Sequence, residues 1–289
     1  MFRPLDRFID AQNWLDSLGE PLQNWVNSLF SGGDTGKQAK NFLNGTWLGH
    51  PLHPVITDVP IGAWVATLVL DTAATVSGDE GFDRAADLTL ATGLAAAAGA
   101  AASGWTDWSD TYGKDRKVGL LHGLTMVGTV LAYTASLGAR WSGNRTVGKM
   151  WSNLGLGLLT AGAYVGGDEV YDLGYGVNHT AFLQGPTDYV PVMPLDDLPT
   201  NKPTKADAKG VPILLVRLQD TLYALDDTCV HAGCSLAGGR LDGASIVCPC
   251  HGSQYDLRDG SVINGPATMR EPSYDVRVQN GVIEVKQGA

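Results

Sequence analysis

Two short stretches, Cys229-Val230-His231-Ala232-Gly233-Cys234 and Cys248-Pro249-Cys250-His251-Gly252-Ser253, decide how the last third of this chain folds. Each offers a thiol and an imidazole at close spacing, Cys-x-His in the first and Cys-x-x-His in the second. Two thiolates on one iron and two imidazoles on the other can hold a [2Fe–2S] centre. A structural zinc site is the alternative, but zinc motifs usually pair Cys with Cys and His with His. The mixed order within each stretch favours the iron–sulfur centre.

Two further cysteines, Cys234 and Cys250, stand at matching places in the two stretches. In order, spacing and additional cysteines, the stretches resemble the motifs of the Rieske proteins of cytochrome bc and b6f complexes. The resemblance covers about residues 206–289 and implies a compact all-β domain with both cluster loops at one tip. It also implies a disulfide between Cys234 and Cys250. The cluster ligands that it implies are Cys229, His231, Cys248 and His251.

The end of the second stretch and the residues after it also resemble the same family. Ser253 and Tyr255 stand where family members donate hydroxyl hydrogen bonds to a bridging sulfide and to a ligand thiolate. Gly265 and Pro266 resemble the proline loop that covers the cluster. Hydrogen bonds to the sulfur atoms favour the reduced, more negative cluster and raise its potential. The resemblance therefore implies a cluster of the high-potential kind.

Composition limits the class of partner. The chain has 289 residues, enough for two domains, and a formal net charge of −10, which argues against a nucleic-acid partner. Residues 1–30 carry four acidic side chains and lack an apolar run followed by a small-residue cleavage site, so we expect no signal peptide. Any attachment to a membrane must then come from segments that the protein retains.

The chain divides into four predicted segments, of which residues 47–182 are described separately below. Residues 1–46 form an N-terminal amphipathic helical segment, in which apolar residues recur at helical spacing and Gly19 and Pro21 are expected to break the helix. Residues 183–205 contain five prolines among polar residues and predict a stiff linker. Residues 206–289 contain short β-type runs and the hairpin signal Asn280-Gly281.

Residues 47–182 hold four apolar stretches, roughly 55–76, 88–104, 118–137 and 152–167. Their lengths approach the ~20 residues that cross a bilayer, and small residues in the second and fourth suit close helix packing. A soluble four-helix bundle is the alternative. The predicted fold is thus multi-domain, a transmembrane α-helical four-helix bundle followed by an all-β domain. With the N-terminus inside, four crossings of the bacterial inner membrane place the β domain on the cytoplasmic side.

Residues 44–177 resemble a bacterial four-helix membrane domain family of uncharacterised function, through His50-Pro51-Leu52-His53-Pro54, Trp105-Thr106-Asp107-Trp108 and Gly166-Gly167. An up-down-up-down bundle brings one end of each helix to the same face. Imidazoles there predict axial ligands of haem b, and a His–carboxylate set alternatively predicts a metal or quinone site. Capping of helix ends is the structural alternative. The candidate residues on this face are His50, His53, His122, His179, Asp107 and Asp168.

These features predict a membrane-bound electron-transfer protein, in which a [2Fe–2S] cluster passes single electrons. The predicted partners are a membrane quinol, a haem or a redox protein. One alternative is an accessory subunit of a larger respiratory complex. Another is a ferredoxin that feeds a separate oxygenase. We expect no oxygenase active site in this chain, since the sequence printed ends soon after the cluster motif.

Overall fold

The structure is a computed structural model that describes residues 8–288. It contains two compact units. Among the described residues, the helical unit holds the chain through Gly33 together with Leu52–Leu173, and the β unit holds Asp34–Pro51 together with residues 174–288. This differs from the predicted boundaries, because the stretches flanking the long helices, which include His50 and His179, belong to the β unit.

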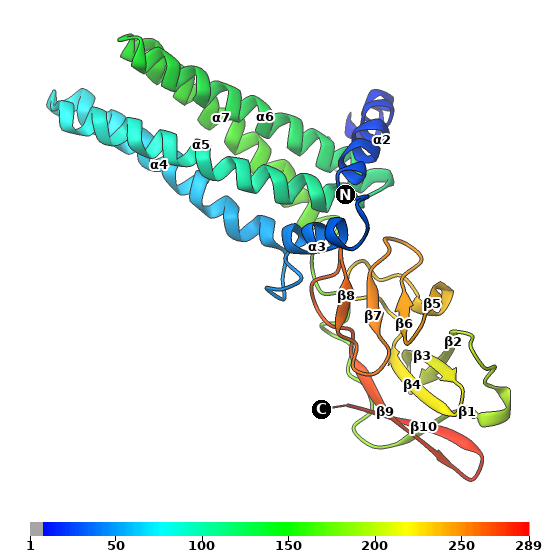
Figure 1. The fold of residues 1–289 in the computed structure, drawn as a ribbon. Helices are drawn as coiled ribbons and strands as arrows, with labels where there is room; N and C mark the ends of the chain where they lie inside the picture. The colour runs from blue at the N-terminus through cyan, green and yellow to red at the C-terminus, as the bar shows by residue number, and fades with distance from the viewer. Residues whose placement is uncertain (1–7, 289) are drawn as a thin grey trace. The chain divides into compact units, whose positions relative to one another are not determined.

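The helical unit contains the predicted bundle of four long helices (Figure 1). Helices α4 (Leu52–Ser77) and α5 (Glu80–Trp108) form one antiparallel hairpin, and α6 (Gly113–Trp141) and α7 (Arg145–Tyr171) form a second. Short turns join the helices of each hairpin. In one of them the Asp79 carboxylate caps α5 by accepting a hydrogen bond of 2.7 Å from the backbone N–H of Gly81.

The helix α2 (Asn13–Ser28) precedes the bundle and runs through Gly19 and Pro21, so the predicted break is wrong. Gly19 is buried, and a Cβ atom there would lie 3.3 Å from Cδ of Arg116. The close packing of Gly19 against α6 thus outweighs the low helix propensity of glycine. The part of the N-terminal segment before residue 8 lies outside the described residues.

Three of the four bundle helices, α4, α5 and α6, are long and apolar enough to cross a membrane by length and composition. The fourth predicted stretch, in α7, is not among them, because glycines and polar residues dilute its apolar run. Large apolar side chains on the three helices face outward, including Leu88, Leu131 and Val69, which are 61–69% exposed. Apolar side chains on the outside of a bundle are expected where lipid is the solvent.

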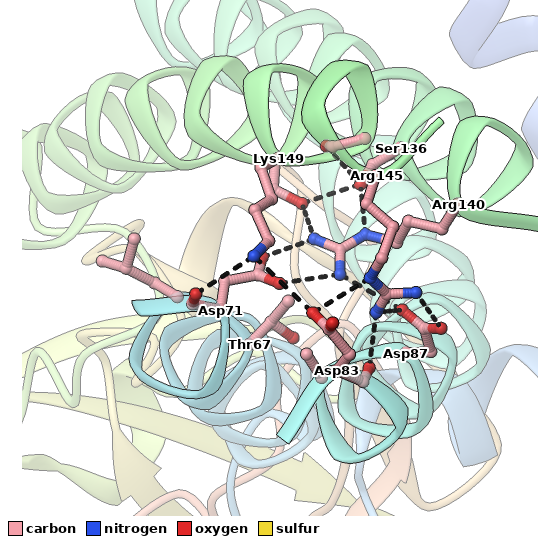
Figure 2. Close-up of polar contacts among 12 residues, drawn as sticks. Thr67, Asp71, Asp83, Asp87, Ser136, Arg140, Arg145 and Lys149 are labelled. Atoms are coloured by element: carbon pink, nitrogen blue, oxygen red, sulfur yellow. Dashed lines mark hydrogen bonds and ion pairs between the residues drawn. The ribbon is translucent and has the colours of Figure 1, made fainter. Parts of the chain in front are cut away.

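An ion network joins all four bundle helices near the α4–α5 and α6–α7 turns (Figure 2). The side chain of Arg140 on α6 is fully buried and forms ion pairs with Asp71 on α4 and Asp87 on α5. Arg145 on α7 also pairs with Asp87, at 2.9 Å. The sequence analysis missed this network because its members are far apart in the chain. Three carboxylates and three cations balance in it, namely Asp71, Asp83, Asp87, Arg140, Arg145 and Lys149.

The β unit contains two antiparallel sheets. The first has six strands in the order β1-β10-β9-β4-β3-β2, and the second has four in the order β5-β6-β7-β8. The helix α3 (Gly33–Asn44) also belongs to this unit, apart from its first residue. The strands are β1 (Val190–Pro194), β2 (Thr204–Ala208), β3 (Val211–Leu218), β4 (Thr221–Asp226), β5 (Arg240–Asp242), β6 (Ser245–Val247), β7 (Gln254–Asp256), β8 (Val262–Asn264), β9 (Ser273–Gln279) and β10 (Val282–Gln287).

The structure differs from the predicted linker over residues 183–205. Strand β1 pairs with β10, and Val190 and Leu198 are each only 3% exposed in the core of the first sheet. Proline is tolerated in β1 because β1 is an edge strand of the sheet. The composition suggested a connector, but a few apolar residues between the prolines are enough to tie the segment to the sheet.

Candidate functional site

The two cysteine–histidine stretches form loops with the same backbone hydrogen bonding. The Cys229 N–H donates to the Cys234 carbonyl, and the Cys248 N–H donates to the Ser253 carbonyl, both at 2.8 Å. Near the end of each loop a glycine adopts a positive φ, +73° at Gly233 and +78° at Gly252. Glycine reaches this backbone region without the strain that a Cβ atom would introduce. The sequence pattern therefore closes two equivalent loops.

A disulfide joins the two loops, as predicted. Cys234 and Cys250 are bonded, with their Cα atoms 6.5 Å apart. The other two cysteines, Cys229 and Cys248, are buried free thiols. The four sulfur atoms thus separate into one bridge and one pair of thiols available as ligands.

The two thiols and the two imidazoles of the loops each form a pair, since Cys229 contacts Cys248 and His231 contacts His251. The rings of His231 and His251 lie with their centroids 4.8 Å apart. Among residues 8–288, no three His, Cys, Asp or Glu side chains converge as a mononuclear metal would require. Two donor pairs suit a dinuclear cluster, with sulfur on one iron and nitrogen on the other.

His231 is in the state that a metal ligand needs. Its side chain is buried, and within the described chain its Nδ1 atom has no hydrogen-bond partner. Burial lowers the pKa of His231 to about 3, so the ring is neutral at physiological pH. A neutral imidazole with a buried, unsatisfied nitrogen fits a ligand of the second iron. The donor set of the loops thus fits a [2Fe–2S] cluster.

The predicted tuning residues lie around the thiols. The Tyr255 hydroxyl is 3.1 Å from Sγ of Cys229, and both residues are buried. Ser253, also buried, accepts a hydrogen bond of 3.0 Å from the backbone N–H of Ala267. This bond ties the second loop to the segment that begins with Gly265 and Pro266. The role expected for Ser253 at a bridging sulfide stays a prediction.

Replacing Tyr255 by phenylalanine should lower the midpoint potential of the cluster. The substitution removes the hydroxyl beside Cys229 and keeps the buried ring. If that bond stabilises the reduced state tenfold over the oxidised one, the potential falls by about 60 mV for a one-electron couple. An EPR-monitored redox titration measures the change. The control is Tyr223→Phe on β4, which should leave the potential unchanged.

The sequence analysis missed Glu271, a fully buried carboxyl beside the first loop. Its Oε2 atom accepts a hydrogen bond of 3.1 Å from the N–H of Val230, which lies between Cys229 and His231. Burial raises the pKa of Glu271 to about 9. No motif in the sequence marks this residue, because its contact with the loop depends on how the segment before β9 returns to the site.

Two segments from outside the predicted β domain also cover the loops. The backbone N–H of His179 donates to the Val230 carbonyl at 3.0 Å, and the ring of Tyr175 meets His231 edge to face, with centroids 5.7 Å apart. On α3, the Asn41 side chain accepts from the N–H of Gly265 at 2.9 Å. These contacts explain why both segments belong to the β unit.

Replacing Asn41 by alanine should loosen the Gly265 loop. Besides the bond from Gly265, the Asn41 amide donates to the Ile263 carbonyl and the Asn264 side chain, both at 3.2 Å. Losing such bonds costs about 1–2 kcal/mol of local stability, which corresponds to roughly five- to thirtyfold faster hydrogen exchange at Gly265. Lys37→Ala, an exposed change on the same helix, should not alter the exchange rate. Equal rates in both variants would contradict the role of Asn41 in holding the Gly265 loop.

The structure places two of the four predicted histidines in each unit. His53 on α4 and His122 on α6 lie together in the helical unit, with ring centroids 6.3 Å apart. His179 lies beside the first cysteine–histidine loop, and His50 is exposed, and both belong to the β unit. The candidate carboxylates Asp107 and Asp168 lie near the ends of α5 and α7.

Comparison with known proteins matches each unit to a family. Residues 188–277 match the model of the "Rieske [2Fe-2S] domain", and residues 49–179 match that of a "Predicted membrane protein (DUF2231)". The first match begins at residue 188 rather than near 206, in agreement with the position of β1 in the sheet.

Relatives of the β unit include ferredoxins and an iron-sulfur subunit of a cytochrome b6-f complex. Ferredoxin CarAc of Metapseudomonas resinovorans is 36% identical over 76 residues, 26% of this chain and 71% of that protein. The cytochrome b6-f complex iron-sulfur subunit 2 of Cyanophora paradoxa is 41% identical over 73 residues, 24% of this chain but only 30% of that protein. Among solved structures, the ferredoxin of carbazole 1,9a-dioxygenase from Nocardioides aromaticivorans IC177 is 32% identical, covering 35% of this chain and 98% of its own, with a TM-score of 0.33.

Proposed function

Because the chain belongs to the Rieske [2Fe-2S] family through its β unit, we propose that it is a membrane-bound carrier of single electrons with a high-potential cluster. Its partner is a membrane quinol, a haem or another redox protein. The observation that carries the proposal is the pairing of two buried free thiols with two adjacent imidazoles in disulfide-linked loops. A bound cluster would supply the one-electron chemistry.

The side chains of the loops would have different roles in binding the cluster and in tuning its potential. Cys229 and Cys248 hold one iron as thiolates, and His231 and His251 hold the other through ring nitrogens. The Tyr255 hydroxyl, beside the Cys229 sulfur, stabilises negative charge on the reduced cluster. The disulfide keeps the two loops together, so that both ligand pairs stay in place when the charge changes.

An EPR-monitored redox titration of the purified protein tests the proposal. We expect a signal with average g below 2 after reduction, and a midpoint in the upper part of the range of about −150 to +300 mV found for Rieske centres. Elemental analysis should return two irons per chain from the cluster. Zinc in place of iron, or no such EPR signal, would overturn the proposal.

A second candidate function is supported by the relatives that are ferredoxins. In this case the β unit would pass electrons to a separate oxygenase. The midpoint potential of the cluster distinguishes the two functions. A low midpoint potential would favour the ferredoxin, and a high one would favour the respiratory type. The disulfide and the Tyr255 contact support the high-potential alternative.

The attachment to a membrane rests on the helical unit. Its match to a predicted membrane protein and its three sufficiently apolar helices support a location in the membrane. We further propose the bacterial inner membrane, with the β unit on the cytoplasmic side. Protease treatment of right-side-out and inverted membrane vesicles tests the side, because the β unit should be cut only in the inverted ones.

A further inference from the structure

Two histidines from different hairpins of the bundle lie against each other. His53 is on α4 and His122 is on α6, and their ring planes are nearly perpendicular, at 87°. Both side chains are partly buried between the helices. They form a pair of imidazoles inside a segment where uncompensated polar groups are costly, and such residues are most often functional.

A hydrogen bond fixes the proton on each ring. Nδ1 of His53 lies 2.8 Å from the Ala100 carbonyl on α5, and Nδ1 of His122 lies 2.8 Å from the Gly162 carbonyl on α7. A carbonyl only accepts, so Nδ1 must carry the proton and Nε2 of a neutral ring keeps its lone pair. Metal-ligating histidines almost always have this arrangement, in which the other ring nitrogen donates to a carbonyl or carboxylate. Both rings therefore have the tautomer of a metal-ligating histidine.

Glycines on the neighbouring helices make room for both rings. A Cβ atom at Gly104 of α5 would lie 2.8 Å from Nδ1 of His53. A Cβ atom at Gly166 of α7 would lie 2.9 Å from Nδ1 of His122. Any larger residue at either position would push the ring out of place. Gly104 and Gly166 thus leave room for the two imidazole rings inside the bundle and limit where each ring can lie.

The separation of the rings is compatible with a shared metal. A ring nitrogen lies ~1.2 Å from its centroid and a metal–imidazole bond is about 2.0–2.1 Å, so two imidazoles opposite each other on one metal have centroids about 6.4 Å apart. The observed centroid separation of 6.3 Å matches this value.

A bare ion usually needs three or more protein ligands, and no group of three is found among residues 8–288. Haem iron brings four nitrogens of its own and takes two axial imidazoles. From this geometry we infer that His53 and His122 are the axial ligands of a haem in the helical unit. The sequence has no Cys-x-x-Cys-His motif, so the haem would be the non-covalent b type. The inference does not depend on the function proposed for the β unit.

Optical spectroscopy of the full-length protein, purified in detergent, tests the inference. We expect a Soret band that shifts on reduction with dithionite, and one b-type haem per chain in the pyridine haemochrome assay. His53→Ala and His122→Ala should each reduce the haem content to background. His50→Ala is the matched control and should keep full haem content, since this histidine is exposed in the other unit.

Two further variants separate ligation from loss of folding. His122→Met should keep the haem but change its spectrum to that of a His–Met centre. Gly104→Ala should reduce haem content, while Gly62→Ala on α4, where a Cβ atom meets nothing within 4 Å, should not. The EPR signal of the β unit, recorded on the same samples, should persist in all of them. Absence of haem from the unaltered protein, full haem content in both alanine variants, or a copper ion in its place would overturn the inference.

Discussion

Replacing Asp71 by alanine should destabilise the helical unit by about 3 kcal/mol. The substitution leaves the fully buried guanidinium of Arg140 without the carboxylate that meets two of its nitrogen atoms. Breaking a buried ion pair from one side costs about 3–5 kcal/mol, and the remaining contact with Asp87 at 3.2 Å places this case at the lower end. Unfolding of the full chain in detergent, followed by the loss of helical signal, measures the change.

A double variant tests the physical cause of that loss. Asp71→Ala combined with Arg140→Met removes both charges, so it should be more stable than Asp71→Ala alone. The control Asp79→Ala removes only the exposed cap of α5, and should cost about 1 kcal/mol. A double variant no more stable than the single one would show that the buried charge is not the reason for the loss.

The second large effect is at the cluster loops. Cys248→Ser should abolish the EPR signal of the reduced protein, because it removes one of the two thiols that can bind iron. Replacing both Cys234 and Cys250 by serine should leave the ligand set intact. Opening this bridge, which closes a loop of 16 residues, should instead lower the unfolding free energy by about 3 kcal/mol.

Iron content, EPR signal and thermal stability of the two variants separate the two roles. The serine pair should bind iron with the unaltered signal at low temperature and lose it at a lower temperature than the parent protein. If Cys248→Ser kept a full signal, or if the serine pair lost all iron on purification, the assignment of ligands and bridge would be wrong.

The sequence predicted those features whose determinants are close together in the chain. The cluster loops follow from two hexapeptides, and the bundle follows from four apolar runs separated by charged turns. Features that depend on distant contacts were missed. Asn41 meets Gly265 across 224 positions, and Arg140 meets Asp71 across 69. Neither pair has a local pattern, because a single polar residue in a helix is as common on a solvated face as in a buried network.

Composition was misleading where isolated residues decide the structure. Residues 183–205 have the prolines of a linker, yet buried Val190 and Leu198 attach this segment to the first sheet. Of the four histidines predicted on one face of the bundle, His50 and His179 lie in the β unit.

The contact between Asn41 and Gly265 also constrains the membrane topology of the chain. The residues before Pro51 and those after Gly174 share one compact unit, so they must emerge on the same side of the lipid. Between them the chain must cross an even number of times. Three is an odd number of crossings and is therefore excluded. Either α7 crosses the bilayer together with α4, α5 and α6, or one of these three more apolar helices does not cross it.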